Sequence, residues 1–279
     1  MHLFWHRVFV VATASLTPPV PLGPNAPMGW PKRKKAQAIL FVADSKKGVL
    51  MYDPNDANSS PEGSITTGVD YPDGIAVDNT GALYVTNLGS NTVTVYPAGM
   101  NSPSLMISTG INQPYGIGVD SKGDVFVSNL GNNTVTAYQA GGTAPYETIS
   151  FYSYGQPTGI GVDAHDNVWI ACDSTNKVYE IAAGSSQPRG VALKSLDQPI
   201  GISFGEKDEI FVSNYSGSNL NVYEYGKRTP SAQITHGIED EGPGLAGVTS
   251  SDTYFQSNEA DDVVGYRKGK TSLHGASRR

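Results

Sequence analysis

The sequence has one cysteine, few charged residues and no long apolar run. A single cysteine, Cys172, excludes an internal disulfide framework. No segment approaches the ~20 consecutive apolar residues of a membrane-spanning helix, so we expect no membrane span. Charged residues make up only 16% of the chain, and no segment repeats its apolar residues with the period of an amphipathic helix. These absences argue against a disulfide-rich fold, a helical membrane protein and a helical bundle.

The charge is acidic and unevenly distributed. The formal net charge is −7, and the basic residues gather near the two ends, at 32–35 and 268–279. An acidic middle would repel a phosphate backbone, so we expect no nucleic-acid partner. The basic ends are interpreted as solvated tails rather than binding patches.

Glycine, proline and tyrosine are plentiful. The chain has 32 Gly, 18 Pro and 15 Tyr in 279 residues. Glycine and proline supply the backbone angles of tight turns, so this composition favours many short strands. The length suits one large all-β domain.

Three landmarks repeat along the chain with spacings of 41 to 44 residues. A glycine followed by an apolar residue recurs at Gly74, Gly116, Gly159, Gly201 and Gly244. An apolar strand recurs at Val42, Val85, Val127, Ile170, Val212 and Phe255. A tyrosine about ten residues later recurs at Tyr52, Tyr96, Tyr138, Tyr179, Tyr223 and Tyr266. A repeat of this length is typical of the blade of a β-propeller.

Each repeat contains four short strand patterns separated by turns. In the copy that begins at Gly74, residues 75–77, 83–85, 92–96 and 104–108 read as strands. The sequence therefore predicts an all-β, six-bladed β-propeller of four-stranded antiparallel blades. The first blade lacks an evident inner strand. Three explanations are open: residues 7–12 supply the inner strand across a long loop, the blade has only three strands, or some sequence is missing at the start.

The N-terminal region differs from the repeats. Arg7 precedes the short apolar run 8–12, and a proline-rich stretch extends to Pro31. This pattern resembles a short secretion signal followed by a linker. We therefore expect a leader and linker over 1–37, a propeller over 38–279, and export to the periplasm or the extracellular space.

One segment carries a family resemblance. The stretch from Tyr71 to Asp78, Tyr-Pro-Asp-Gly-Ile-Ala-Val-Asp, continues to Gly81-Ala-Leu-Tyr-Val. It resembles NHL repeats and the corresponding part of SMP-30/gluconolactonase-like and virginiamycin B lyase-like six-bladed propellers. The resemblance covers residues 38 to 270 and implies the fold, without selecting one member of the superfamily.

The resemblance also implies where ligands bind. In such propellers the residue before each repeat glycine lies at the mouth of the central channel, which here gives Asp73, Tyr115, Thr158, Ile200 and Pro243. SMP-30-like lactonases hold a divalent metal there with acidic and amide oxygens. Only Asp73 matches such a ligand, whereas Ile200 and Pro243 offer no side-chain oxygen. The five histidines are not placed to converge as a lyase of the virginiamycin B type requires.

A second ring is expected where each second strand ends. Its members are Asp44, Asn87, Asn129, Cys172, Asn214 and Ser257, with Asp173 directly after Cys172. The functional interpretation is an amide-rich collar that hydrogen-bonds a sugar or a peptide backbone. The structural interpretation is that Asn and Asp begin these turns because their side chains satisfy local backbone groups.

These observations favour a non-catalytic, monomeric propeller that binds a protein or glycan at its channel mouth and needs no cofactor. The candidate binding residues are Asp73, Tyr115, Thr158, Asp44, Asn87, Asn129, Asp173 and Asn214. One alternative is a hydrolase or lactonase dependent on a divalent metal such as Ca²⁺, with Asp73 as ligand, or a related lyase. Another is an extracellular structural repeat protein.

Overall fold

The computed structural model describes residues 11–15, 38–54, 60–205, 207–236, 238, 243–248, 253–258, 262–267 and 273–277. At residues 11–15, at residue 38 and beyond residue 238 it describes the backbone alone. Short strands dominate this part of the chain, and the only helices in it are two 3₁₀ turns, η1 (Leu130–Asn132) and η2 (Asp173–Thr175).

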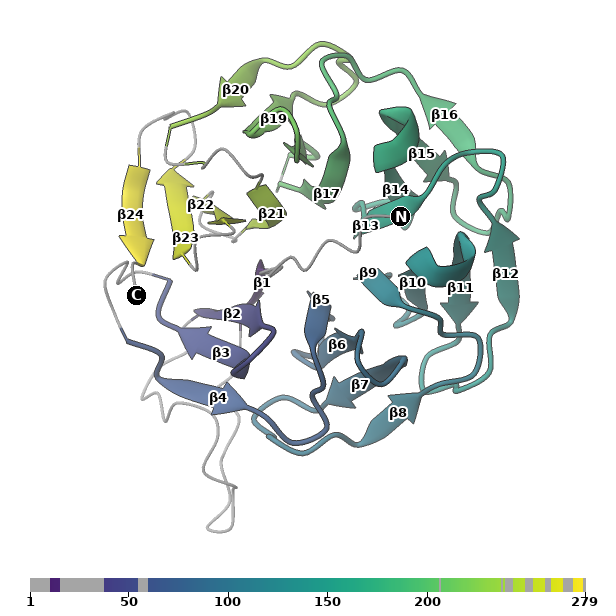
Figure 1. The fold of residues 1–279 in the computed structure, drawn as a ribbon, viewed down its shortest axis with the longest axis vertical. Coiled ribbons are helices and arrows are strands. Elements are labelled where there is room, and N and C mark those ends of the chain that lie inside the picture. Colours follow the sequence, from purple (N-terminus) through teal and green to yellow (C-terminus); the bar gives the residue numbers. More distant parts are fainter. Residues whose placement is uncertain are drawn as a thin grey trace.

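The strands form four-stranded sheets in which each strand pairs with its neighbour in sequence. The pairings are antiparallel throughout. Figure 1 shows the sheets arranged radially around a common axis, with one edge strand of each nearest the centre. The fold is therefore an all-β propeller of small antiparallel sheets.

Five of these sheets carry the complete repeat, and each begins with an inner strand that contains the repeat glycine. These strands are β5 (Pro72–Val77), β9 (Pro114–Val119), β13 (Pro157–Val162), β17 (Pro199–Phe204) and β21 (Pro243–Val248). The second strands are β6 (Leu83–Asn87), β10 (Val125–Asn129), β14 (Val168–Cys172), β18 (Ile210–Asn214) and β22 (Thr253–Asn258).

The outer half of each sheet follows the same plan. The third strands are β7 (Thr92–Tyr96), β11 (Thr134–Tyr138), β15 (Lys177–Ile181), β19 (Asn219–Tyr223) and β23 (Asp262–Arg267). The outer strands are β8 (Leu105–Ile107), β12 (Glu147–Ser150), β16 (Arg189–Val191), β20 (Ala232–Ile234) and β24 (Leu273–Ser277).

The remaining sheet is assembled differently. It contains β1 (Val11–Ser15), β2 (Ala38–Asp44), β3 (Gly48–Tyr52) and β4 (Gly63–Ile65). Its inner strand β1 lacks the repeat glycine and pairs with β2 from Val11 opposite Val42 to Ser15 opposite Ala38. Of the three alternatives for this sheet, the structure has the one in which the N-terminal segment supplies the inner strand, but at residues 11–15 rather than at the expected 7–12. Five residues of the predicted leader therefore belong to this sheet.

The repeat glycines allow neighbouring inner strands to approach closely. A Cβ on Gly74 would lie 2.1 Å from the carbonyl oxygen of Tyr115 in β9, and one on Gly116 would lie 2.4 Å from that of Thr158 in β13. Real Cβ atoms are not found that close to backbone oxygens. Gly74 and Gly116 therefore lie where adjacent blades touch, and a larger residue would not fit at either position.

The repeated tyrosines join neighbouring blades at their periphery. The hydroxyl of Tyr96 donates to the Thr67 carbonyl at 2.8 Å, and that of Tyr138 donates to the Thr109 carbonyl at 2.8 Å. Each acceptor lies between the outer strand of one sheet and the inner strand of the next. Buried rings with a satisfied hydroxyl combine apolar packing with a directional bond, so Tyr96 and Tyr138 hold neighbouring blades together. The described part of the chain contains no helix long and apolar enough to cross a membrane.

Candidate functional site at the channel mouth

The mouth face is formed by two kinds of loop. Each inner strand begins at the same end of its blade at which the second and third strands are joined, because consecutive strands are antiparallel. The two loops are hydrogen-bonded to each other: the amide of Leu88 donates to the Tyr71 carbonyl, and that of Leu130 donates to the Gln113 carbonyl, both at 3.0 Å. The mouth therefore has a rigid rim.

The asparagine collar is buried inside this rim. Asn87, Asn129 and Asn214 are completely buried. The Asn87 side-chain oxygen accepts the backbone amide of Asp70 at 3.0 Å, and its nitrogen donates to the Thr92 and Thr94 hydroxyls at 3.2 and 3.0 Å. The equivalent oxygens of Asn129 and Asn214 accept the amides of Asn112 and Asp197. These contacts favour the structural interpretation, since the amides hold linker and loop together.

Thr158 is also engaged within the fold. Its hydroxyl lies 3.1 Å from the carbonyl of Ala171 and 3.0 Å from that of Pro199 in the next blade. In two other blades, a hydroxyl at the fourth position of the second strand connects its own inner strand to the inner strand of the next blade. Thr86 and Ser128 accept the amides of Gly74 and Gly116 at 2.6 and 2.7 Å and bond the next blade's carbonyl.

Thr158 therefore compensates for a substitution. The fourth position of β14 is Ala171, which has no hydroxyl, whereas β6, β10 and β18 have Thr86, Ser128 and Ser213 there. Thr158, from the facing strand, supplies a hydroxyl that reaches the next blade instead. The sequence pattern did not reveal that this hydroxyl is used internally.

Asp73 is the exception at the mouth. Its side chain is 3% exposed, and burial raises the pKa of its carboxyl from 3.8 to about 8. No hydrogen bond or ion pair to the Asp73 carboxylate is found among the described residues. A buried carboxyl without a partner favours the neutral form because desolvation penalises the charged form. Tyr115, the next residue of the ring, is 9% exposed.

The remaining candidates lie at turns. Asp44 is buried, and its carboxylate accepts the amides of Lys46 and Lys47 at 2.9 and 3.0 Å. Asp173 is half-buried, and burial raises the pKa of its carboxyl. Cys172 is a free, buried cysteine, and burial, with the Asp173 charge second, raises the pKa of its thiol to about 12. A thiol held protonated in this way is not an activated nucleophile.

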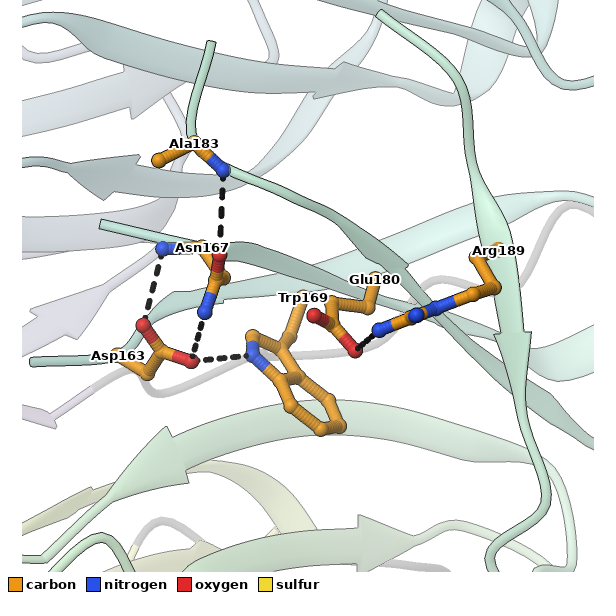
Figure 2. Close-up of polar contacts among 6 residues, drawn as sticks. All are labelled: Asp163, Asn167, Trp169, Glu180, Ala183 and Arg189. Carbon is orange, nitrogen blue, oxygen red and sulfur yellow. Dashed lines mark hydrogen bonds and ion pairs between the residues drawn. The ribbon is translucent and has the colours of Figure 1, made fainter. Parts of the chain in front are cut away.

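Aspartates at the opposite face cap hairpins. Asp78, Asp120 and Asp163 each accept the amides two and four residues later at 2.8 to 2.9 Å. Figure 2 shows the third of these: the Asp163 carboxylate also accepts the Asn167 side-chain amide and the Trp169 indole N–H, both at 2.9 Å. Their bonds are those of turn caps rather than of a catalytic group.

One feature of the mouth was not predicted. The linker between β12 and β13 places Phe151 and Tyr154 against Tyr179, with ring centroids 5.0 to 6.0 Å apart. Tyr152, between them, is 74% exposed. The Tyr154 carbonyl accepts the hydroxyl of Thr175 in η2 at 2.9 Å, which ties the linker to the neighbouring rim loop. The only signal for this feature in the sequence is the aromatic segment Phe-Tyr-Ser-Tyr, which no other linker contains.

The mouth residues do not fit the metal site that the resemblance implies. Asp73 is the sole carboxylate among the ring residues that precede the repeat glycines, and the Thr158 hydroxyl is already bonded to two carbonyls. Within the described residues no group of three His, Cys, Asp or Glu side chains is placed to hold a metal ion. Ca²⁺ needs about six to eight oxygen ligands, which is more than these mouth side chains supply.

Solved structures share this fold at low sequence identity. The chain resembles virginiamycin B lyase from Staphylococcus aureus with a TM-score of 0.64 and 12% identity, covering 97% of this chain and 89% of that one. A streptogramin B lyase gives 0.61 and 13%, covering 98% and 88%, and a chain of a nidogen/laminin complex gives 0.64 and 12%, covering 86% and 90%. The chain matches no protein-family profile and no curated protein sequence.

At such identities the likeness establishes the class of fold and nothing finer. The chain shares the fold of these structures, which in this chain is a β-propeller of four-stranded antiparallel sheets. One neighbour is an enzyme and another is part of a protein complex, so the fold by itself does not select between catalysis and binding.

Proposed function

We propose that this chain is a non-catalytic, exported, monomeric propeller that binds a protein or glycan partner at its mouth face. The proposal rests on the hydrogen bonds of the polar residues at the mouth. The side chains of Asn87, Asn129, Asn214 and Thr158 are bonded to backbone groups of the chain itself. What remains at the mouth is a rigid rim with exposed side chains. A rigid rim suits binding, because little conformational freedom is lost on association.

We assign the binding energy to exposed side chains of the rim loops rather than to the buried asparagine collar. Tyr152 is the most exposed of the large hydrophobic residues described, and the rings of Phe151 and Tyr154 pack together within the same linker. Exposed tyrosines on a rigid support are favoured at protein interfaces, and their rings also stack on sugars. We further propose that the sheet β1–β4 completes the ring as a sixth blade, so that the rim is continuous.

The experiment compares two exposed tyrosines on either side of one strand. Tyr152 follows β12 on the mouth face, whereas Tyr146, 51% exposed, precedes the same strand at its opposite end. A partner is first identified on protein and glycan arrays, and its affinity is then measured for Tyr152→Ala and Tyr146→Ala. We expect a loss of roughly tenfold or more for the first, as for an interface hot spot, and no change for the second.

Equal affinities of both variants would contradict a mouth-face site. The alternative function is a metal-dependent hydrolase with Asp73 as a metal ligand, and the buried carboxyl group of Asp73 at the channel mouth is the observation that favours it. Lactone hydrolysis that requires Ca²⁺ and is lost in Asp73→Asn would establish that alternative. Absence of retention on both arrays would leave the structural role.

A further inference from the structure

Asp73 is the one acidic residue in the inner strands that the structure describes. The other inner strands have the sequences Val-Ala-Thr-Ala-Ser, Pro-Tyr-Gly-Ile-Gly-Val, Pro-Thr-Gly-Ile-Gly-Val, Pro-Ile-Gly-Ile-Ser-Phe and Pro-Gly-Leu-Ala-Gly-Val. None contains Lys, Arg or His. The strands around the axis therefore offer no cation to this carboxylate.

The elements packed against β5 offer none either. These are β1, β2, β6 and β9, and their ionisable residues are Asp44 in β2, Tyr84 in β6 and Tyr115 in β9. Tyr84 lies at the far end of its blade, where its hydroxyl donates to Asp78. The two other groups are a carboxyl and a phenol, neither of which carries positive charge.

Neighbouring hydroxyls do not solvate the carboxylate. The Thr86 hydroxyl accepts the Gly74 amide at 2.6 Å and bonds the Tyr115 carbonyl at 2.9 Å. The Thr158 hydroxyl is bonded to two other carbonyls. Burial of a carboxyl without a compensating partner costs free energy, and such a residue at the start of an inner strand has no evident value for folding. A ligand group that completes it would account for its presence.

We propose that Asp73 is the receptor for a single organic cation, an alkylammonium or guanidinium group, carried by the partner that binds at the mouth. The inference rests on the proposed function and adds the chemistry of the ligand. A monovalent organic cation fits better than a divalent metal, because one carboxylate neutralises it and its N–H groups bond the two carboxylate oxygens.

Binding of this kind is coupled to a proton. Asp73 must lose its proton to pair with the cation, and the proton passes to solvent as the ligand enters. For a ligand that stays charged, the affinity is therefore expected to rise about tenfold per pH unit below the pKa of the unliganded carboxyl and to level off above it.

The test uses the full chain and four probes: n-butylammonium, neutral n-butanol of the same length, N-acetyl-lysine methylamide, and Ca²⁺. Titration calorimetry is run at pH 6, 7 and 8 in two buffers of different ionisation enthalpy. We expect both ammonium compounds to bind, with about tenfold gain per pH unit and close to one proton released at pH 6, and n-butanol not to bind. Tighter binding of the lysine derivative identifies a polypeptide source, and equal binding identifies a free amine.

Two controls keep the inference falsifiable. Asp73→Asn removes the charge with little change of shape and is expected to abolish binding of both ammonium compounds. The pH dependence of the unmodified chain needs no variant and stands if that variant fails to fold. Affinity that is independent of pH, binding that survives in Asp73→Asn, or binding of Ca²⁺ in place of the amines would overturn the inference. None of these outcomes alters the Tyr152 comparison, which tests the proposed function separately.

Discussion

At the scale of single residues, burial separates side chains that look alike in the sequence. Asp73 and Asp78 stand five residues apart, near the two ends of β5. Asp78 has a full set of turn bonds, whereas Asp73 is buried without a partner among the described residues. The sequence distinguishes the two, since Asp78 recurs with the turns and Asp73 does not recur. It could not predict that burial would hold Asp73 neutral.

Asp73 should make stability depend on pH. Its folded pKa, about 8, lies above its ordinary value of 3.8, so the folded chain retains a proton that the unfolded chain has lost. The contribution is fully present below about pH 4 and is lost as pH rises to about 8, a total on the order of 5 kcal/mol. The measurement is the urea midpoint of the unmodified chain and of Asp73→Asn at pH 5, 6.5 and 8.

In that comparison the unmodified chain should weaken relative to the variant as pH rises. The two chains differ only at position 73, and Asn cannot ionise. The difference between their urea midpoints therefore reports the titration of Asp73, because the other titrating groups are present in both chains. Two parallel curves would mean that the Asp73 carboxylate is stabilised in its ionised form, which would contradict the unpartnered site.

At the scale of strands, the period of the sequence predicted the elements well and the linkers poorly. Strand positions follow from apolar residues that pack between blades, such as Val85 and Val127, both completely buried. The linkers between blades are held by a few hydrogen bonds, and the linker residues that make them differ from blade to blade. The asparagine collar is the clearest case: its spacing was evident, but only the bonds to Asp70, Asn112 and Asp197 distinguish a clamp from a ligand surface.

The hydroxyl of Thr158, which bonds the next inner strand, should be replaceable by a hydroxyl at position 171. Thr158→Ala removes the bonds to Ala171 and Pro199 and is expected to lower the free energy of unfolding by about 1 to 3 kcal/mol. Adding Ala171→Ser places a hydroxyl where Ser128 has one in β10, and should recover part of that loss. Denaturant unfolding of the two single variants and the double variant measures the coupling.

Ala171→Ser alone is the matched control, because it adds a hydroxyl while Thr158 still occupies the bonds. We expect it to be neutral or destabilising, since the site is completely buried. Strictly additive effects of the two substitutions would refute the compensation.

At the scale of the whole molecule, the proposed closure of the ring depends on the sheet that the repeat does not describe. Five sheets carry the inner-strand glycine, whereas the sheet β1–β4 takes its inner strand from residues 11–15. The segment between β1 and β2 is long, and the two strands nevertheless pair over five residues. A sequence that resembles an export leader therefore also supplies a strand. Cleavage of a leader after residue 15 would remove this strand, whereas the sheet needs it to be retained.

Truncation separates these roles. Removing residues 1–10 leaves β1 intact and should change stability little, whereas removing residues 1–15 exposes the ladder edge of β2 (Figure 1). β2 is apolar, and Ile39, Phe41 and Val42 are almost completely buried, so the longer truncation should lower the thermal midpoint strongly and promote aggregation of the open edge. Thermal unfolding and light scattering of the two truncated chains give the comparison. Mass spectrometry of the expressed protein then shows whether any cleavage falls before Val11, as the proposed role of β1 in closing the ring requires.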